Sequence, residues 1–186
     1  TGVQTCALPI CKDNSRILIQ NTRCSKNGGA FQTGGRLQVT HSSVVSLQNV
    51  IAGNHGGGFN AYGEVEIAWN STVKISNSRA EAKSGGGFNT GKGLKVSTGS
   101  RLTIRNATAG MHGGGFFARG KTLISSSTVS IQNARARLYG AGFYSQKEVV
   151  IDEMSTVRIS DSRSEKKGGG FVRSEERRVG KECRSR

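Results

Sequence analysis

The amino-acid sequence predicts an all-β fold: a right-handed parallel β-helix, or solenoid, of about six coils, each with about 28 residues and three short strands. A motif of small residues followed by phenylalanine returns at a nearly constant interval. Apolar and polar residues alternate in several short segments, and no segment has the 3.6-residue apolar period of a helix. One such unit cannot bury its apolar side alone, whereas stacked copies can.

The glycine–phenylalanine motif sets the period. It reads GGGF at 56–59, and neighbouring copies are spaced by 28, 29, 28, 27 and 28 residues. We expect the glycines to supply a positive φ or a close backbone approach at a corner, and the aromatic rings to stack in a column inside the coils. The phenylalanines of this column are Phe31, Phe59, Phe88, Phe116, Phe143 and Phe171.

Two other positions recur at fixed offsets. An aliphatic residue stands eight residues after each phenylalanine except the last: Val39, Ile67, Val96, Ile124 and Ile151. An amide or acid stands ten or eleven residues before each phenylalanine: Asn21, Asn49, Asn77, Asn106, Asn133 and Asp161. The alternation in segments such as VKISN and LTIRN predicts half-buried strands, and it places these side chains inward as a ladder of amides. Asp161 interrupts this ladder, because an ionised carboxylate only accepts hydrogen bonds.

Other repeat folds fit less well. A leucine-rich repeat has a similar period, but the first part of its L-x-x-L-x-L-x-x-N pattern is missing here. Propeller blades need about 40–50 residues each.

Both ends of the chain resemble translated sequencing-library adapters. Residues 1–10 read TGVQTCALPI and residues 173–186 read RSEERRVGKECRSR. We therefore treat 1–10 and 173–186 as adapter-derived, and 11–172 as a β-helix fragment truncated at both ends. Without the six Lys or Arg and three Asp or Glu of 173–186, 21 basic residues face nine acidic ones, a formal charge of +12. The fragment is strongly basic, and it has no apolar run long enough for a membrane-spanning helix.

Seven basic residues fall in one turn of the repeat, between the asparagine position and the glycine motif. Stacking is expected to align them in a stripe that attracts anionic partners such as acidic glycans, although a solubilising flank is the alternative. Nucleic acid is not favoured as a partner, because only Tyr139 supplies an aromatic ring in that turn. The residues of the stripe are Arg79, Lys83, Arg135, Arg137, Arg163, Lys166 and Lys167.

The histidines and cysteines do not predict a metal site. His55 and His112 occupy one repeat position two coils apart, or roughly 10 Å, which is too far for one zinc ion, and His41 lies elsewhere in its coil. We interpret all three as turn residues. Cys11 and Cys24 fall in columns of aliphatic and small residues and are expected to be buried, with a disulfide between them left open.

The few acidic residues do not predict an active site. β-Helical lyases and hydrolases need clustered carboxylates for calcium binding or acid–base chemistry. Glu64 and Glu66 are the closest pair on one strand, and Glu148, Asp152 and Glu153 lie near one another along the chain. We interpret them as solvated surface, with Asp152 pointing outward. The fragment is thus expected to contain no catalytic, cofactor-binding or metal-binding residue.

Two N-glycosylation sequons occur, at Asn70 and Asn106. Asn70 is expected in a turn, where a eukaryotic host could modify it. Asn106 is expected to face inward and to be unusable.

Units such as LTIRNATAGMHGGGF resemble the repeats of chlamydial-type polymorphic outer-membrane proteins, and pectin-lyase-like repeats are nearly as similar. The first family carries Gly-Gly-Ala-Ile and Phe-x-x-Asn motifs; here Phe59 and Phe88 stand where it has isoleucine, and its phenylalanine before the asparagine is absent. The resemblance implies an autotransported β-helical passenger that acts in adhesion at the cell surface or outside the cell.

We therefore expect a non-catalytic segment of a secreted or cell-surface β-helix protein with an adhesin-like structural and binding role. Its partners would be an anionic glycan or a host-surface ligand and the neighbouring coils of its parent chain. Two alternatives stay open: a non-catalytic slice of a β-helical polysaccharide lyase or glycoside hydrolase, and a basic module that binds anionic polysaccharide.

Overall fold

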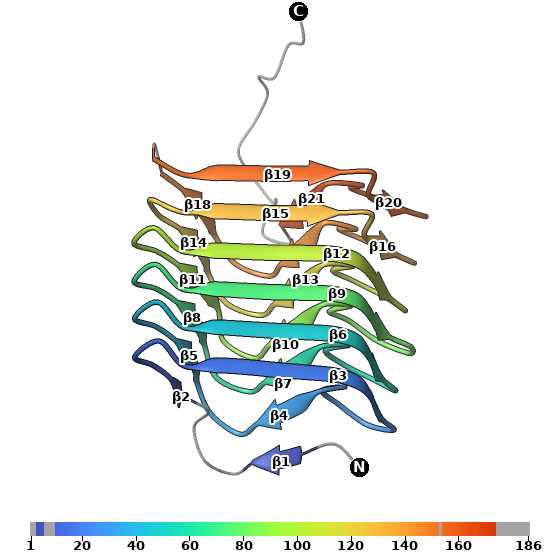
Figure 1. Ribbon diagram of the computed structural model, residues 1–186. Helices are drawn as coiled ribbons and strands as arrows, with labels where there is room; N and C mark the ends of the chain where they lie inside the picture. The colour runs from blue at the N-terminus through green and yellow to red at the C-terminus, as the bar shows by residue number, and fades with distance from the viewer. Residues whose placement is uncertain (1–2, 6–9, 153, 174–186) are drawn as a thin grey trace, which may run out of the picture.

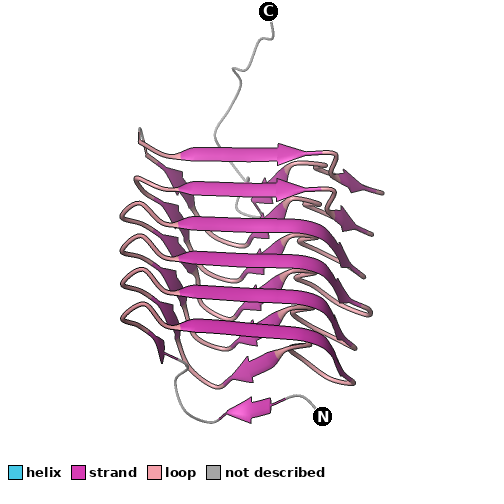
Figure 2. Cartoon of the chain, in the orientation of Figure 1, coloured by secondary structure: helices cyan, strands magenta, loops and turns pink. Residues whose placement is uncertain are grey.

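The chain folds as a right-handed parallel β-helix of about six coils, as the sequence predicts. A computed structural model describes residues 3–5, 10–152 and 154–173, and every regular element within them is a β-strand (Figure 2). In Figure 1 the strands nearest the viewer run from left to right, and the chain returns behind them while it climbs from the N-terminal to the C-terminal end. This is the handedness that parallel crossover connections favour.

Three parallel sheets form the walls of the solenoid. The Phe sheet contains β1 (Val3–Thr5), β4 (Phe31–Thr33), β7 (Phe59–Ala61), β10 (Phe88–Thr90), β13 (Phe116–Ala118), β17 (Phe143–Ser145) and β21 (Phe171–Arg173). The side sheet contains β2 (Ile10–Cys11), β5 (Leu37–Val39), β8 (Val65–Ile67), β11 (Leu94–Val96), β14 (Thr122–Ile124) and β18 (Val149–Ile151). The front sheet, which faces the viewer in Figure 1, contains β3 (Arg16–Cys24), β6 (Val44–Ala52), β9 (Thr72–Ala80), β12 (Arg101–Ala109), β15 (Thr128–Gln132), β16 (Arg135–Ala136), β19 (Thr156–Ser160) and β20 (Arg163–Ser164).

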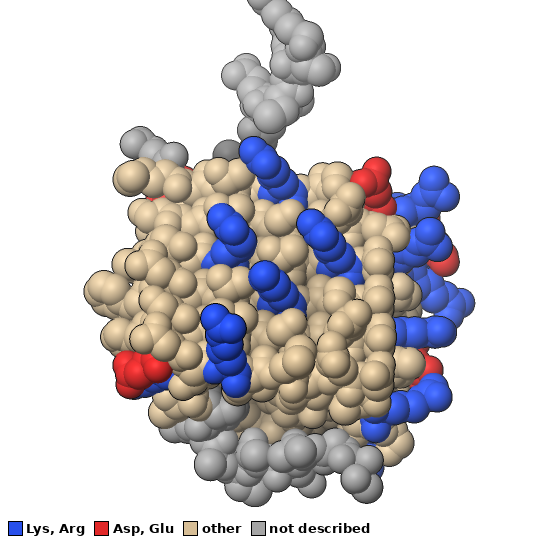
Figure 3. All heavy atoms as spheres, viewed as in Figure 1, with Lys and Arg blue, Asp and Glu red and all other residues tan. Residues whose placement is uncertain are grey.

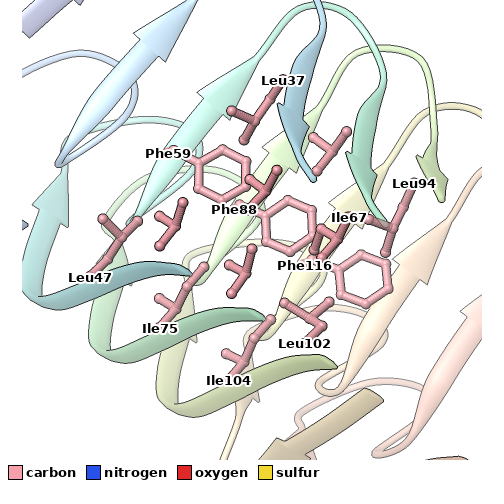
Figure 4. Packing of buried hydrophobic residues seen from close by; sticks show 14 of the residues in the cluster. Leu37, Leu47, Phe59, Ile67, Ile75, Phe88, Leu94, Leu102, Ile104 and Phe116 are labelled. Atoms are coloured by element: carbon pink, nitrogen blue, oxygen red, sulfur yellow. The ribbon is translucent and has the colours of Figure 1, made fainter. Parts of the chain in front are cut away.

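The phenylalanines of the repeat form one column of stacked rings in the core (Figure 4). Neighbouring ring centroids lie 4.6–5.2 Å apart, with interplanar angles of 1–9°. Phe59, Phe88, Phe116 and Phe143 are fully buried. The aliphatic residues that follow them are buried beside the rings, with Val39, Ile67, Val96 and Ile124 at 0% exposure. Equivalent residues of successive coils therefore lie directly over one another.

The glycines of the motif have two different roles at the corner before the Phe sheet. The first glycine, such as Gly56 with a φ of 65°, takes the left-handed conformation that side chains disfavour. The second, such as Gly57, lies so close to the next coil that a Cβ would overlap the carbonyl oxygen of Gly86. The corner is therefore closed to larger residues both by backbone conformation and by the spacing between coils.

The asparagine ladder exists, but its expected inward orientation is wrong. Each amide Nδ2 donates to the Oδ1 of the coil below at 2.9 Å, in four successive steps from Asn133 to Asn21. None of these side chains is buried: Asn133 is half-buried and the others, Asn106 included, are exposed. Their φ values of 51–55° bend the front-sheet strand and reset its alternation, so the next residue, such as Val50 or Ala107, points inward instead. Asparagine tolerates this conformation better than other side chains do.

Asp161 occupies the same position in the last described coil and also has a positive φ, of 52°. Among the described side chains, no hydrogen bond joins it to Asn133. An ionised carboxylate has no proton to donate to the amide below it, which explains why the ladder ends there.

A second ladder, of buried serines, was not predicted. A serine immediately precedes each long front-sheet strand, and Ser71 Oγ accepts a hydrogen bond from the backbone N–H of Ser43 at 3.2 Å. Ser100 and Ser127 repeat this contact with the coil below at the same distance. The signal was present in the sequence as a serine every 27–29 residues, at Ser15, Ser43, Ser71, Ser100, Ser127 and Ser155.

The core is less covered at the C-terminal end. Ile151 and Phe171 continue the inward columns but are 42% and 48% exposed, because no described coil lies above them. At the other end, Val3 of the adapter-like segment pairs with Phe31 and extends the Phe sheet. A free sheet edge is a template for pairing with an extended segment.

Candidate functional site

The predicted basic stripe lies along the end of the front sheet, where Arg79, Arg135 and Arg163 belong to β9, β16 and β20, and on the turn that leads from there to the Phe sheet. All seven of its residues are exposed, and the register places Arg135 beneath Arg163 and two coils above Arg79. The other members occupy neighbouring positions of the same turn. A hollow of about 300 Å³ is lined by Arg135, Arg137 and Arg163, together with Glu165. The acid reduces the positive potential of this turn.

A larger basic surface covers the outer face of the front sheet. The strands of this sheet contain nine Lys or Arg and no Asp or Glu. Three of the nine, Arg79, Arg135 and Arg163, belong to the basic stripe, and Arg23 forms an ion pair with Glu81 at 2.7 Å. Figure 3 shows Lys and Arg side chains standing on this face, with acidic atoms only near its margins. The exposed cations that precede the asparagine position in the long strands are Arg16, Lys74, Arg101, Arg105 and Arg158.

Three of these cations surround a shallow groove. Lys74 on β9 pairs with Thr103, which lies between Arg101 and Arg105 along β12. The strand spacing and the two-residue offset put the backbone of Lys74 roughly 8 Å from that of each arginine. The groove has a volume of about 380 Å³, and its polar lining also includes Ser46, Ser76 and Thr103. None of the three cations forms an ion pair with a described residue, so their charges are available to a ligand.

Sequence reasoning missed this surface because its members are distant along the chain. Lys74 and Arg101 are 27 residues apart and become neighbours only through the stacking register. A usable signal was present at the two x positions of the alternating V-x-I-x-N segments, where lysine and arginine occur and acids do not.

Glu66 is not solvated surface, so that interpretation was wrong. Its Oε2 accepts hydrogen bonds from Arg36 at 2.6 Å and Gln38 at 2.9 Å, and its Oε1 lies 3.2 Å from Lys95 Nζ. Glu64 lies 3.5 Å from the same Arg36. The side chains one coil below and one coil above enclose Glu66, whose side chain is only 11% exposed. This carboxylate therefore holds three coils of the side sheet together.

The ion network around Glu66 predicts a pH dependence of stability. Burial alone raises the pKa of Glu66, but the hydrogen bonds from Gln38 and Lys95 and the charge of Arg36 outweigh it and hold the pKa below its usual range. The stabilisation is therefore complete above the unfolded value of about 4.3 and is lost as the pH falls through the folded value. We expect Glu66→Gln to lower the free energy of unfolding at neutral pH by about 1–3 kcal/mol and to flatten its acid dependence.

Denaturant unfolding between neutral and acid pH measures this effect. Glu165→Gln, at an exposed position, is the matched control with the same charge change. An equal shift in both variants would contradict a specific role for Glu66.

The other predicted carboxylates lie apart. Glu148 is exposed and pairs with Lys121 at 2.9 Å. Asp152 points outward, where its Oδ1 accepts hydrogen bonds from Ser126 N–H and Ser155 Oγ and closes a turn. Glu153 lies outside the described residues. The structure therefore does not bring Glu66, Glu148 and Asp152 into one cluster.

The histidines lie in turns and are partly occupied in packing. Ser84 lies in the coil between those of His55 and His112. Gly56 N–H, next to His55, donates to the carbonyl oxygen of Ser84, and Gly85 N–H, next to Ser84, donates to the carbonyl oxygen of His112. His112 stacks on Tyr139 at 5.2 Å, and burial lowers the pKa of His112. The pKa of His55 is also lowered, by burial and then by the charges of Lys83 and Arg119. In the described part of the chain no three metal-ligating side chains come together.

Cys11 and Cys24 are both free thiols. Cys11 pairs with Val39 and is buried, and burial raises the pKa of its thiol. Cys24 pairs with Ala52 in the small-residue column and is only partly buried. Both cysteines thus occupy the columns that the repeat assigns to them.

The two sequons differ in their hydrogen bonding. Asn70 is exposed in the turn before β9, as expected. Asn106 is exposed too, but its amide donates to Asn77 and accepts from Asn133. A glycan on Asn106 would replace one of the two Nδ2 protons, at the nitrogen that donates to Asn77 in the ladder.

Comparisons with protein-family models, curated proteins and solved structures find no match to this chain. The described residues include no helix long and apolar enough to cross a membrane. The molecule is therefore defined by its fold and by one surface: it is a right-handed β-helix with a front sheet whose strands carry basic and no acidic residues.

Proposed function

We propose that this chain is a non-catalytic binding segment of a secreted or cell-surface β-helix protein, and that its front sheet contacts an acidic polysaccharide. The observation that carries the proposal is the group of five exposed cations on the outer face of the front sheet, Arg16, Lys74, Arg101, Arg105 and Arg158, in strands that contain no acid. Like charges gathered on one face raise the local concentration of anionic ligands and speed their association.

The groove around Lys74 supplies chemistry that suits sulfate or carboxylate groups on sugars. Lysine and arginine donate charge-assisted hydrogen bonds to such anions. The hydroxyl groups of Ser46, Ser76 and Thr103 are available in the same groove to donate to or accept from sugar hydroxyls. A mixed lining of cations and hydroxyl groups fits an acidic sugar better than a bare phosphate.

The stack also provides the required rigidity. Each front-sheet strand is paired on both sides through the middle of the solenoid, with β6, β9 and β12 in continuous register. Strand spacing of about 4.8 Å repeats the surface along the axis. An extended polysaccharide lying along this axis meets similar hydrogen-bonding groups at successive strands, and a surface held in place before binding loses little entropy when the ligand arrives.

Removal of the three groove cations tests the proposal. The variant Lys74→Gln/Arg101→Gln/Arg105→Gln is expected to bind a sulfated glycan such as heparin about 100-fold more weakly, because each exposed charge-assisted hydrogen bond contributes roughly 1 kcal/mol or more. Isothermal titration at low and at physiological salt measures the loss. The affinity of the original chain should also fall as salt rises.

The control variant Lys92→Gln/Arg119→Gln/Lys147→Gln removes the same charge from exposed residues in the turns between the Phe sheet and the side sheet. It should retain most of the affinity. Equal losses in the two variants would show that net charge alone causes binding. Tighter binding to single-stranded nucleic acid than to sulfated and carboxylated glycans would overturn the assignment of ligand class.

A further inference from the structure

An exposed aromatic pair stands at the edge of the front sheet, and the packing of the solenoid does not account for it. Trp69, the one tryptophan of the chain, is 54% exposed in the turn between β8 and β9. His41 occupies the equivalent turn one coil below and is also exposed. The two rings stack with centroids 6.0 Å apart and an interplanar angle of 16°.

The backbone at Trp69 is unfavourable for so large a side chain. Trp69 has a φ of 57° and His41 a φ of 55°. The equivalent positions of other coils carry Asp13 and Ser126, which fit this turn conformation more easily, and Thr98, whose β-branched side chain does not. A bulky residue at positive φ is an outlier, and such strain concentrates at sites of function.

Hydrogen bonds hold the turn in place. The carbonyl oxygen of Trp69 accepts from Ser42 N–H at 2.8 Å and from Ser71 Oγ at 3.4 Å. Ser71 belongs to the buried serine ladder, so the turn is anchored to the coils on both sides. The indole is thus exposed on a fixed support rather than on a loose loop.

The aromatic pair adjoins the basic groove. Trp69 precedes Thr72 by three residues, which is at most about 10 Å of chain. Thr72 pairs across the sheet with Arg101, one of the three groove cations. The backbone of Arg101 therefore lies at most about 15 Å from that of Trp69, a span that a short oligosaccharide covers.

We infer that Trp69 and His41 form a stacking subsite for a sugar ring of the acidic polysaccharide, while Arg101 holds an acidic group of the same ligand. The faces of a pyranose carry apolar C–H groups that pack on an indole, whose edge stays in contact with water. The inference rests on the proposed function and adds to it a requirement for sugar rings, which charge alone does not impose.

Tryptophan fluorescence tests the subsite directly, because all indole emission comes from Trp69. Titration of the full chain with a sulfated oligosaccharide should change this emission, whereas titration with inorganic polyphosphate should change it little. Trp69→Ala should weaken binding of the oligosaccharide by about fivefold and leave the affinity for polyphosphate unchanged. Trp69→Phe, which retains a ring, should restore most of the affinity.

The outcomes separate this inference from the proposed function. If the oligosaccharide binds through the groove cations but Trp69→Ala binds it as tightly as the original chain, the stacking subsite is refuted and the basic surface stands. The proposed function and the stacking subsite are both refuted if no acidic glycan binds. They are also both refuted if neither the groove triple variant nor Trp69→Ala changes the affinity for the oligosaccharide. Thermal unfolding of each variant must stay near that of the original chain, and Trp69→Phe serves as the comparison if the alanine variant is less stable.

Discussion

Gly86→Ala adds a single methyl group and is expected to lower the free energy of unfolding by on the order of 4 kcal/mol or more. A Cβ at position 86 would overlap the carbonyl oxygen of Gly114 and lie 2.6 Å from the carbonyl carbon of Thr108. These neighbours are backbone atoms of the next coil, held by a continuous hydrogen-bond ladder, and they cannot move without separating the coils. Thermal unfolding followed by circular dichroism measures the loss.

Gly34→Ala is the matched control. No atom lies within 4 Å of a Cβ built at Gly34, so this variant is expected to change stability by less than about 1 kcal/mol. If the two alanine variants unfolded at similar temperatures, the close approach of the coils at the glycine corner would be contradicted.

Phe88→Ala is expected to cost about 3–5 kcal/mol, because it opens a cavity in the middle of the aromatic column. Phe88 is fully buried, and its ring lies 4.7 Å from that of Phe59 and 5.1 Å from that of Phe116. Coils that contact only their neighbours cannot collapse laterally to fill the space. Denaturant unfolding should show a lower midpoint, in proportion to the lost free energy.

Phe171→Ala removes the same ring at the exposed end of the column. Phe171 is 48% exposed and stacks only on Phe143, at 4.9 Å, within the described residues. This variant should cost about 1 kcal/mol or less. A loss as large as that of Phe88→Ala would mean that the column does not derive its stability from burial.

The sequence predicted the architecture because the repeat and the fold share one period. Phe59, Phe88 and Phe116 recur at the length of one coil, and parallel register then requires their rings to stack. The role of the glycines at the corner was equally predictable from the sequence, since neither a positive φ nor a close backbone approach tolerates a Cβ.

The orientation of the asparagines could not be read in the same way. Alternation along VKISN predicts Asn77 inside, yet the positive φ at Asn77 turns its side chain outward and starts a new alternation at Ser78. A single left-handed residue inside a strand breaks the two-residue rule without any change in composition. The amide ladder nevertheless forms, because its hydrogen bonds require only that the asparagines occupy equivalent positions in successive coils, and they do not require burial.

The candidate site was the least predictable part. The seven basic residues of the turn were recognisable because they cluster along the chain. Lys74, Arg101 and Arg105 surround one groove only after β9 and β12 are paired, and Glu66 is enclosed only because Arg36 and Lys95 lie on neighbouring coils.

The sequence by itself determined the period, the parallel stacking and the identity of the core columns, because these follow from residue types that repeat every coil. Only the tertiary structure decided which charges meet, which side of the strand each asparagine takes and where Trp69 stands relative to Arg101. The physical reason is that a solenoid brings into contact residues about one coil apart, and the interactions between them depend on vertical register and on local φ rather than on proximity along the chain.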